Sequence, residues 1–235
     1  MANVKGPPEL TPGAQYLLRI ARENDTHRAL AKNAALHAVL EFGEEFMRAC
    51  REKKLAALTS LLGTEKTPPN FLAITAAVLH RVRERTDRRL RDREQEPGVT
   101  AVSDFNRHVL QGFSEALADL AWPERAAQDF DGPPAKTVFS EIAQHDLNTI
   151  WKRTLQHYLA NIFQDYFAAL RIREDVTDLE PSAEVDLRSI DALAVATYAI
   201  QLTADVAGGD AVSPAIVAFS LDRAIDETLR RRGSG

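Results

Sequence analysis

Apolar side chains along most of this chain recur at intervals of three and four residues, which is the spacing of one face of an α-helix. Prolines and glycines interrupt the pattern where helices should begin or end. About seven helices are predicted, near residues 12–24, 26–62, 70–95, 100–121, 135–173, 183–207 and 214–231. No stretch alternates apolar and polar residues as a half-buried β-strand does. The pattern therefore predicts an all-α protein, an irregular helical bundle around one long central helix.

The predicted central helix, 135–173, contains no proline or glycine and holds six of the sixteen aromatic residues (two Trp, four Tyr and ten Phe). Its middle carries no Asp, Glu, Lys or Arg for eleven residues, from 154 to 164. The apolar residues there are Leu155, Tyr158, Leu159, Ile162, Phe163, Tyr166, Phe167 and Leu170. These positions cover more than one side of a helix. We expect the helix to be the centre of the bundle or half of an interface between subunits.

Two helix starts and one break can be placed from local sequence. Thr11-Pro12 and Ser213-Pro214 each put a capping hydroxyl before a proline suited to the first helical position. The predicted helix 26–62 is long for a compact domain, so we expect a break near Gly43 or Lys53.

The domain organisation follows from one polar, proline-containing segment. Residues 123–134 are predicted to connect an N-terminal helical part, 1–122, to a C-terminal helical part, 135–235, that contains the long helix. The two parts are expected to pack as a single domain.

Charge is distributed unevenly along the chain. The formal net charge is −5, which argues against a nucleic-acid-binding protein because phosphate recognition usually needs a positive surface. Residues 1–118 carry 18 Lys and Arg against 15 Asp and Glu, a net of +3, and residues 119–235 carry 11 against 19, a net of −8. This asymmetry favours pairing of the two halves within one chain or between chains.

The basic excess includes seven arginines between 81 and 93 that alternate with acids. Such a segment is typical of a solvated helix with ion pairs three or four residues apart. An acidic cluster around Pro181 comprises Asp175, Asp178, Glu180, Glu184 and Asp186. The cluster is interpreted as a solvated linker, with docking onto the arginine-rich helix as an alternative.

The cellular setting is inferred from composition. Cys50 is the only cysteine, so no intrachain disulfide can form, and a reducing cytoplasm is expected. No uncharged segment approaches the roughly 20 residues of a bilayer span, and residues 1–8 lack the apolar core of a signal peptide. We therefore expect a cytoplasmic protein with no membrane association. Abundant alanine, and arginine in excess of lysine, favour a bacterial source.

A His-Asp pair introduces one enzymatic alternative. His145-Asp146, with His108 upstream and Asp205 downstream, gives the order H…HD…D. This order resembles that of HD-domain phosphohydrolases, and the resemblance implies a divalent metal that activates water. It covers these four residues only. The context departs from the family because no apolar run precedes the pair and no small residue and lysine follow it.

Arg22 and His27 supply a second enzymatic alternative. Their spacing resembles the loose arginine-to-histidine spacing of HEPN-type helical ribonucleases. The resemblance implies that the pair would act on a 2′-hydroxyl and a phosphate of RNA. A structural reading is also open, in which Thr26 caps a helix and His27 lies in its first turn.

No glycine-rich phosphate loop, nucleophile elbow or zinc-binding His-Glu-x-x-His occurs in the sequence, and neither a cofactor nor a metal is expected. The favoured function is a non-enzymatic helical interaction or scaffold protein, either a subunit of a bacterial multi-protein complex or a homo-oligomer. Its partner would be another protein or a second copy of the chain. The residues expected at the interface are Trp151, Tyr158, Phe163, Tyr166 and Phe167. The alternative is that all five lie in the core of the monomer.

Overall fold

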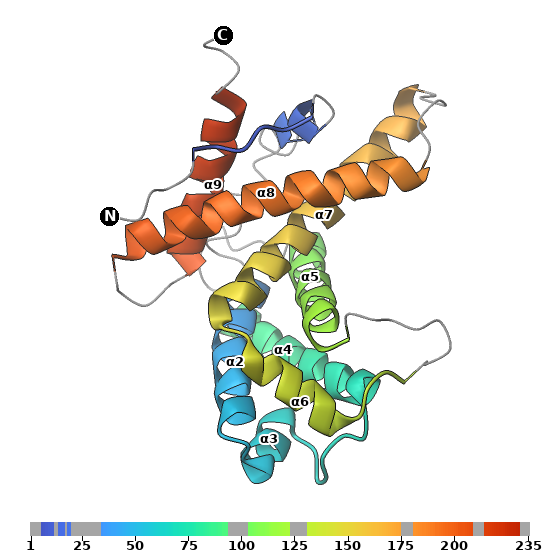
Figure 1. The fold of residues 1–235 in the computed structure, drawn as a ribbon, viewed down its shortest axis with the longest axis vertical. Helices are drawn as coiled ribbons and strands as arrows, with labels where there is room; N and C mark the ends of the chain where they lie inside the picture. Colours follow the sequence, from blue (N-terminus) through green and yellow to red (C-terminus); the bar gives the residue numbers. More distant parts are fainter. Residues whose placement is uncertain are drawn as a thin grey trace. The chain divides into compact units, whose positions relative to one another are not determined.

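A computed structural model describes residues 6–11, 14–16, 18–19, 34–93, 103–122, 131–174, 181–208 and 214–230. Side chains are described in these ranges except at 93, 103–105, 162–174, 181–190, 214 and 218. The helices with defined bounds are α2 (Ala34–Arg51), α3 (Leu55–Leu62), α4 (Phe71–Arg93), α5 (Ser103–Ala121), α6 (Ala135–Gln144), α7 (Leu147–Glu174), α8 (Pro181–Ala207) and α9 (Pro214–Arg230) (Figure 1). No strand forms within the described ranges. The prediction of an all-α fold is confirmed.

The chain forms two compact units. One is continuous and spans Ala34–Thr154; the other, the terminal unit, combines Met1–Asn33 with Leu155–Gly235. The second boundary falls inside α7, so this helix belongs to both units. The predicted connector 123–134 joins α5 to α6, and both of these helices lie in the 34–154 unit.

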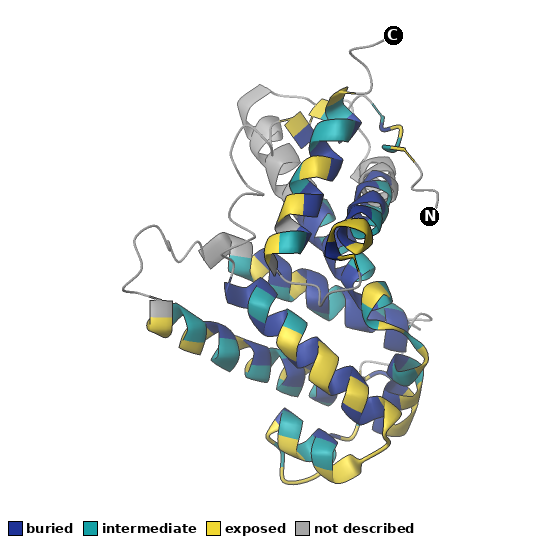
Figure 2. Cartoon of the chain, turned by 90° about the vertical axis from the view of Figure 1, so that its left-hand side faces the viewer, coloured by how far each residue is buried: buried dark blue, intermediate teal, exposed yellow. Residues whose placement is uncertain are grey.

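The 34–154 unit is built around α2, which packs against α3, α4, α5 and α6. Buried residues recur along one side of its helices, as the dark-blue bands in Figure 2 show. The rings of Phe42 and Phe46 stack with centroids 5.8 Å apart, and Phe46 meets Phe139 of α6 edge-on at 6.3 Å. Aromatic contacts of this kind add to the free energy of burial. They fix α2 and α6 in one core.

The predicted helix 26–62 is divided near Lys53, one of the two positions proposed for a break. Helix α2 continues through Gly43 and ends at Arg51, and α3 begins at Leu55. Lys53 lies between them with φ of 52°, a left-handed conformation that ends helical hydrogen bonding. Residues 26–33 lie outside the described part of the chain.

The prediction of one continuous helix over 135–173 was wrong. The segment forms α6 and α7, which are separated at His145 and Asp146, and His145 has extended backbone with φ of −96° and ψ of 156°. Asp146 Oδ1 accepts hydrogen bonds from Thr149 N at 2.7 Å and Thr149 Oγ1 at 2.6 Å. The His145 carbonyl accepts one from Arg51 Nη2 of α2 at 2.7 Å. These bonds replace the Thr149 to His145 hydrogen bond of an unbroken helix.

The terminal unit contains the helix start that was predicted at Thr11. Ala14 N donates to Thr11 Oγ1 at 3.3 Å, as expected of an N-cap. The same hydroxyl donates to Asp191 Oδ2 of α8 at 2.8 Å. Burial raises the pKa of Asp191, and the Thr11 hydrogen bond offsets part of that effect. The predicted cap at Ser213 lies outside the described residues.

Helices α8 and α9 pack against each other in the terminal unit. Several of the buried residues of α8 are alanines, including Ala196 and Ala199, and α9 contributes Ala224. Small side chains allow helix axes to approach closely. The hydroxyl of Tyr198 on α8 donates to Glu227 on α9. Burial, with a smaller effect of this carboxylate, raises the pKa of Tyr198 to about 12. A hydrogen bond therefore supplements the apolar contact.

Within the described ranges, none of the helices combines the length and apolar character needed to cross a lipid bilayer.

Candidate functional site

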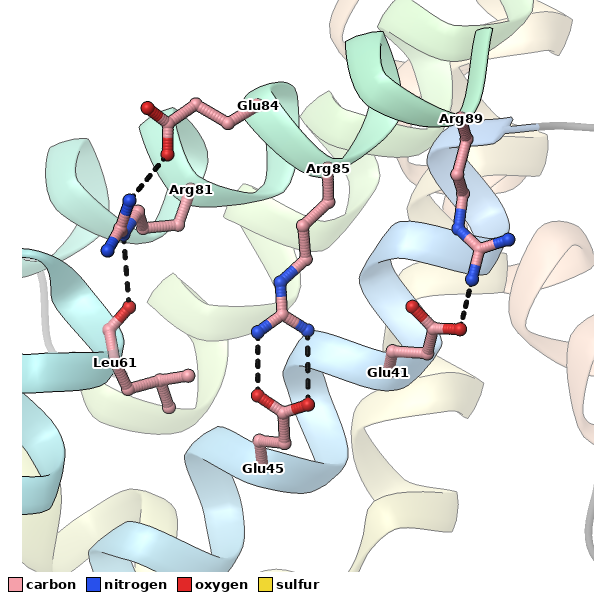
Figure 3. A network of polar contacts seen from close by, with 7 residues as sticks. All are labelled: Glu41, Glu45, Leu61, Arg81, Glu84, Arg85 and Arg89. Atoms are coloured by element: carbon pink, nitrogen blue, oxygen red, sulfur yellow. Dashed lines mark hydrogen bonds and ion pairs between the residues drawn. The ribbon is translucent and has the colours of Figure 1, made fainter. Parts of the chain in front are cut away.

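Helix α4 carries the arginine-rich segment, and three of its arginines point toward α2 and α3 (Figure 3). Arg85 forms two hydrogen bonds with Glu45, at 3.2 Å and 2.6 Å, and its guanidinium lies 5.3 Å from the ring centroid of Phe42. Arg89 pairs with Glu41. Arg81 Nη1 contacts Glu84 at 2.7 Å, and Arg81 Nε donates to the Leu61 carbonyl at 3.3 Å.

The arginine-rich segment was expected to be a solvated helix with ion pairs three or four residues apart, and these contacts revise that expectation. Pairs within the helix do occur, since His80 and Arg81 both contact Glu84. Arg85 and Arg89, however, bind carboxylates of α2 and so hold two helices together. This face of α4 also buries Val78 and Val82. A different face of the helix is turned toward α5.

A groove of about 670 Å³ lies between α4 and α5, within the 34–154 unit. Its α4 wall consists of Leu79, Arg83, Thr86, Asp87 and Leu90. Its α5 wall consists of Asn106, Arg107, Leu110, Gln111, Ser114 and Glu115. We call this feature the α4/α5 groove. The α4 positions are spaced as i, i+4, i+7, i+8 and i+11, so one helical face provides them all.

The groove combines apolar and charged surface. Leu79, Leu90 and Leu110 are only partly buried, so each keeps accessible apolar area in the groove. Arg83 and Asp87 on the α4 wall are exposed. A helical groove with leucines between charged residues has the composition of a surface that receives another helix. Such a surface binds by apolar burial and is made selective by its charges.

The hydrogen bonds of the groove residues show which groups hold the walls in place. The Thr86 hydroxyl donates to the Val82 carbonyl at 2.8 Å within α4. Asn106 Oδ1 accepts from Ala35 N at 3.2 Å and so caps the first turn of α2. Gln111 Nε2 donates to Glu115 Oε1 at 3.0 Å on the same helix. The α5 wall is thus anchored to α2.

The aromatic residues predicted to form an interface divide between the two units. Trp151 lies in the 34–154 unit with 2% of its surface exposed, and Tyr158 lies in the terminal unit with 1% exposed. Both side chains are buried, and their role at an interface or in a monomer core stays a prediction. The side chains of Phe163, Tyr166 and Phe167 lie outside the described set, so their interface role stays a prediction.

The residues of the H…HD…D order occupy different settings. Asp146 is the cap of α7, and its hydrogen bonds with Thr149 lower its pKa. His108 is buried on α5, and Asp205 is exposed on α8 in the terminal unit. Across the described ranges, no three His, Cys, Asp or Glu side chains are grouped so as to hold a metal ion.

Two further sequence hypotheses fall outside the described residues. Arg22 and His27 of the ribonuclease alternative are among them. So are the side chains of the acidic cluster between Asp175 and Asp186. Both hypotheses stay predictions.

Cys50 is buried beside the core of the 34–154 unit. Burial raises the pKa of its thiol to about 12. The thiol therefore stays protonated at neutral pH and packs as a small apolar side chain.

The α4/α5 groove was missed in the sequence, although part of its signal is present. Leu79 and Leu90 lie on the same helical face as Arg83 and Asp87, and a mixed face of this kind indicates partial rather than full burial. Arginines and acids alternate along this helix. The sequence alone therefore does not show which charges face α2 and which face the groove. Comparison of the chain with protein-family models, curated proteins and solved structures found no match.

Proposed function

We propose that this chain is a non-enzymatic helical interaction protein and that the α4/α5 groove is its docking surface for another protein chain. The observation that carries the proposal is the composition of the groove, in which partly buried leucines are flanked by charges on both walls. Burying such leucines against a partner is favourable because it removes apolar surface from water. The surrounding charges would select the partner and its orientation.

The packing of the walls supports this proposal. Helix α4 is fixed to α2 through Arg85 and Arg89, and α5 is fixed to α2 through Asn106. Both walls are therefore attached to the same helix. A groove held in this way loses little conformational freedom when it is filled, which favours binding. From Leu79 to Leu90 the α4 wall rises about 16 Å, enough for three turns of a docked helix.

Site-specific photocrosslinking in cells tests the proposal. A photoreactive amino acid replaces Ser114, which lines the α5 wall, and in a matched variant it replaces Leu72, which is 56% exposed on α4 outside the groove. Position 114 should give a discrete crosslinked protein band, and position 72 should not. Equal yields at both positions, or no crosslink at position 114, would contradict a docking role for the groove.

A further inference from the structure

Both walls of the α4/α5 groove are α-helices, and this limits the kind of chain that can lie between them. Main-chain N–H and C=O groups inside a helix are already hydrogen-bonded to each other. An extended chain would find no main-chain partners on these walls and would bury its own polar groups unpaired. The described residues that line the groove also include no aromatic side chain, whereas grooves that bind proline-rich chains are lined by aromatics. A helix, which satisfies its own main chain, fits the groove best.

The leucines set the length of the helix that fits. Leu79 and Leu90 lie eleven positions apart on the α4 wall, which is about 16 Å along the helix axis. Leu110 adds apolar surface on the α5 wall, and all three side chains are only partly buried. A docked helix removes this surface from water most fully if it carries a large apolar residue beside each end of the α4 wall. Those two residues would be about eleven positions apart as well.

Two charges lie between these leucines on the α4 wall. Arg83 and Asp87 are one helical turn apart, and both are exposed. Neither side chain forms an ion pair or a hydrogen bond with another described residue. Covering them with a chain that lacks opposite charges would cost free energy of desolvation. The groove therefore fits a helix with an acid beside Arg83 and a base beside Asp87.

The polar residues of the α5 wall add no such requirement. Arg107, Gln111 and Glu115 already take part in interactions within the chain. The charge pattern expected of the occupant therefore comes from the α4 wall alone.

The described part of this chain does not itself present such a helix face. Outside the groove, its exposed large apolar residues are Tyr16, Leu55, Leu72, Val206 and Phe219, and no two of them lie on the same helix. We infer that the occupant of the groove is an amphipathic helix of a different protein, with an acid and a base one turn apart between two large apolar residues. This inference rests on the proposed docking function of the same groove.

Photocrosslinking from two positions on the α4 wall tests the geometry. A photoreactive amino acid with an apolar side chain replaces Leu79 in one variant and Leu90 in another, and mass spectrometry identifies the partner residue that each one reaches in cells. A docked helix rises about 1.5 Å per residue, so the two crosslinked residues should be about eleven positions apart in one partner segment. An extended segment rises about 3.3 Å per residue and would place them about five apart. The acid and the base should lie between the two crosslinked residues.

Exchange of the two charges in R83D/D87R tests the pairing and keeps the net charge of the chain. In a chain with the photoreactive residue at position 114, this exchange should reduce the crosslink yield at least about tenfold, because like charges then face each other. R91D/D92R makes the same exchange at exposed positions outside the groove and should leave the yield unchanged. Exchanging the acid and the base in the identified partner segment should restore crosslinking to R83D/D87R. Far-UV circular dichroism verifies that both variants are folded.

Several results would overturn the inference while the docking function stands. Crosslinked residues about five positions apart, or in unconnected segments, would exclude a docked helix, as would the absence of crosslinks from positions 79 and 90 when position 114 gives one. A folded R83D/D87R variant that crosslinks as well as the wild type would exclude the charge pairing. A crosslink to a second copy of this chain would exclude a different protein. If position 114 gives no crosslink at all, both the docking function and this inference fail.

Discussion

Asp146 determines where α6 ends and α7 begins. In an unbroken helix, the Thr149 N–H would donate to the His145 carbonyl. Here each group has a different partner, since Asp146 accepts from Thr149 and Arg51 donates to His145. The local sequence does contain a capping residue three positions before a threonine. The Arg51 contact, which comes from 94 residues away in sequence, could not have been inferred.

We predict that Asp146→Ala lowers the free energy of unfolding by about 0.5–2 kcal/mol, the usual effect of losing an N-cap. The hydrogen bonds from Thr149 lower the pKa of Asp146 below its ordinary value of 3.8. Its contribution should therefore be complete above that value and be lost as the pH falls through the lower folded-state pKa. Urea denaturation at neutral and acidic pH measures both effects.

Asp146→Asn is the matched control for that prediction. Asparagine caps a helix as well as aspartate does but does not titrate. The variant should keep most of the wild-type stability at neutral pH. It should not show the loss of stability that protonation of Asp146 causes in the wild type at acidic pH. A loss as large as that of the alanine variant would show that capping is not the role of this residue.

Asp191 should show the opposite pH dependence. Burial raises its pKa above the ordinary 3.8, so the folded protein loses stability as the pH rises through the folded-state value. Asp191→Asn keeps an acceptor for the Thr11 hydroxyl and removes the charge. We expect this variant to melt at a higher temperature than the wild type at neutral pH and at a similar temperature below pH 3.8. A lower melting temperature at neutral pH would contradict this account.

Helix α4 has two faces with different surroundings. One binds α2 through Arg85 and Arg89, and the other lines the groove with residues such as Leu79 and Leu90. The helical periodicity in this region was predictable, as were helices near α5, α8 and α9. The assignment of each arginine to a face was not, because it depends on carboxylates of α2 that are about forty or more positions away in sequence.

Arg85→Ala should destabilise the contact between α2 and α4. The change removes a bidentate pair with Glu45 and a cation–π contact with Phe42, and we expect it to lower the free energy of unfolding by about 1–2 kcal/mol. Arg88→Ala, at an exposed position of the same helix, should change it by less than about 0.5 kcal/mol. Chemical denaturation of the two variants measures the difference.

An equal effect of Arg85→Ala and Arg88→Ala would contradict this assignment, because it would mean that helix propensity or total charge determines the result. Arg85→Lys separates charge from geometry. Lysine keeps the positive charge but cannot form the bidentate pair. We expect it to restore only part of the lost stability.

The division of the whole molecule into two units was the feature least accessible from sequence. Residues 123–134 were predicted from their composition to connect two helical parts. Helices α5 and α6, on the two sides of this segment, belong to the same unit. One boundary lies between Thr154 and Leu155, inside a helix. No proline or glycine marks that position, and the charge-free stretch 154–164 that begins there continues the same helix. The two units can be recognised only from which segments contact each other in three dimensions.

At the scale of the whole molecule, the account depends on the α4/α5 groove being filled by another chain in the cell. Hydroxyl-radical footprinting tests this most directly, because it compares the exposure of individual side chains in cells with that in dilute purified protein. We predict that Leu79, Leu90 and Leu110 are modified more slowly in cells, while the exposed Leu55 and Leu72 react at the same rate in both. Equal reactivity of the groove leucines in both settings would contradict the proposed function.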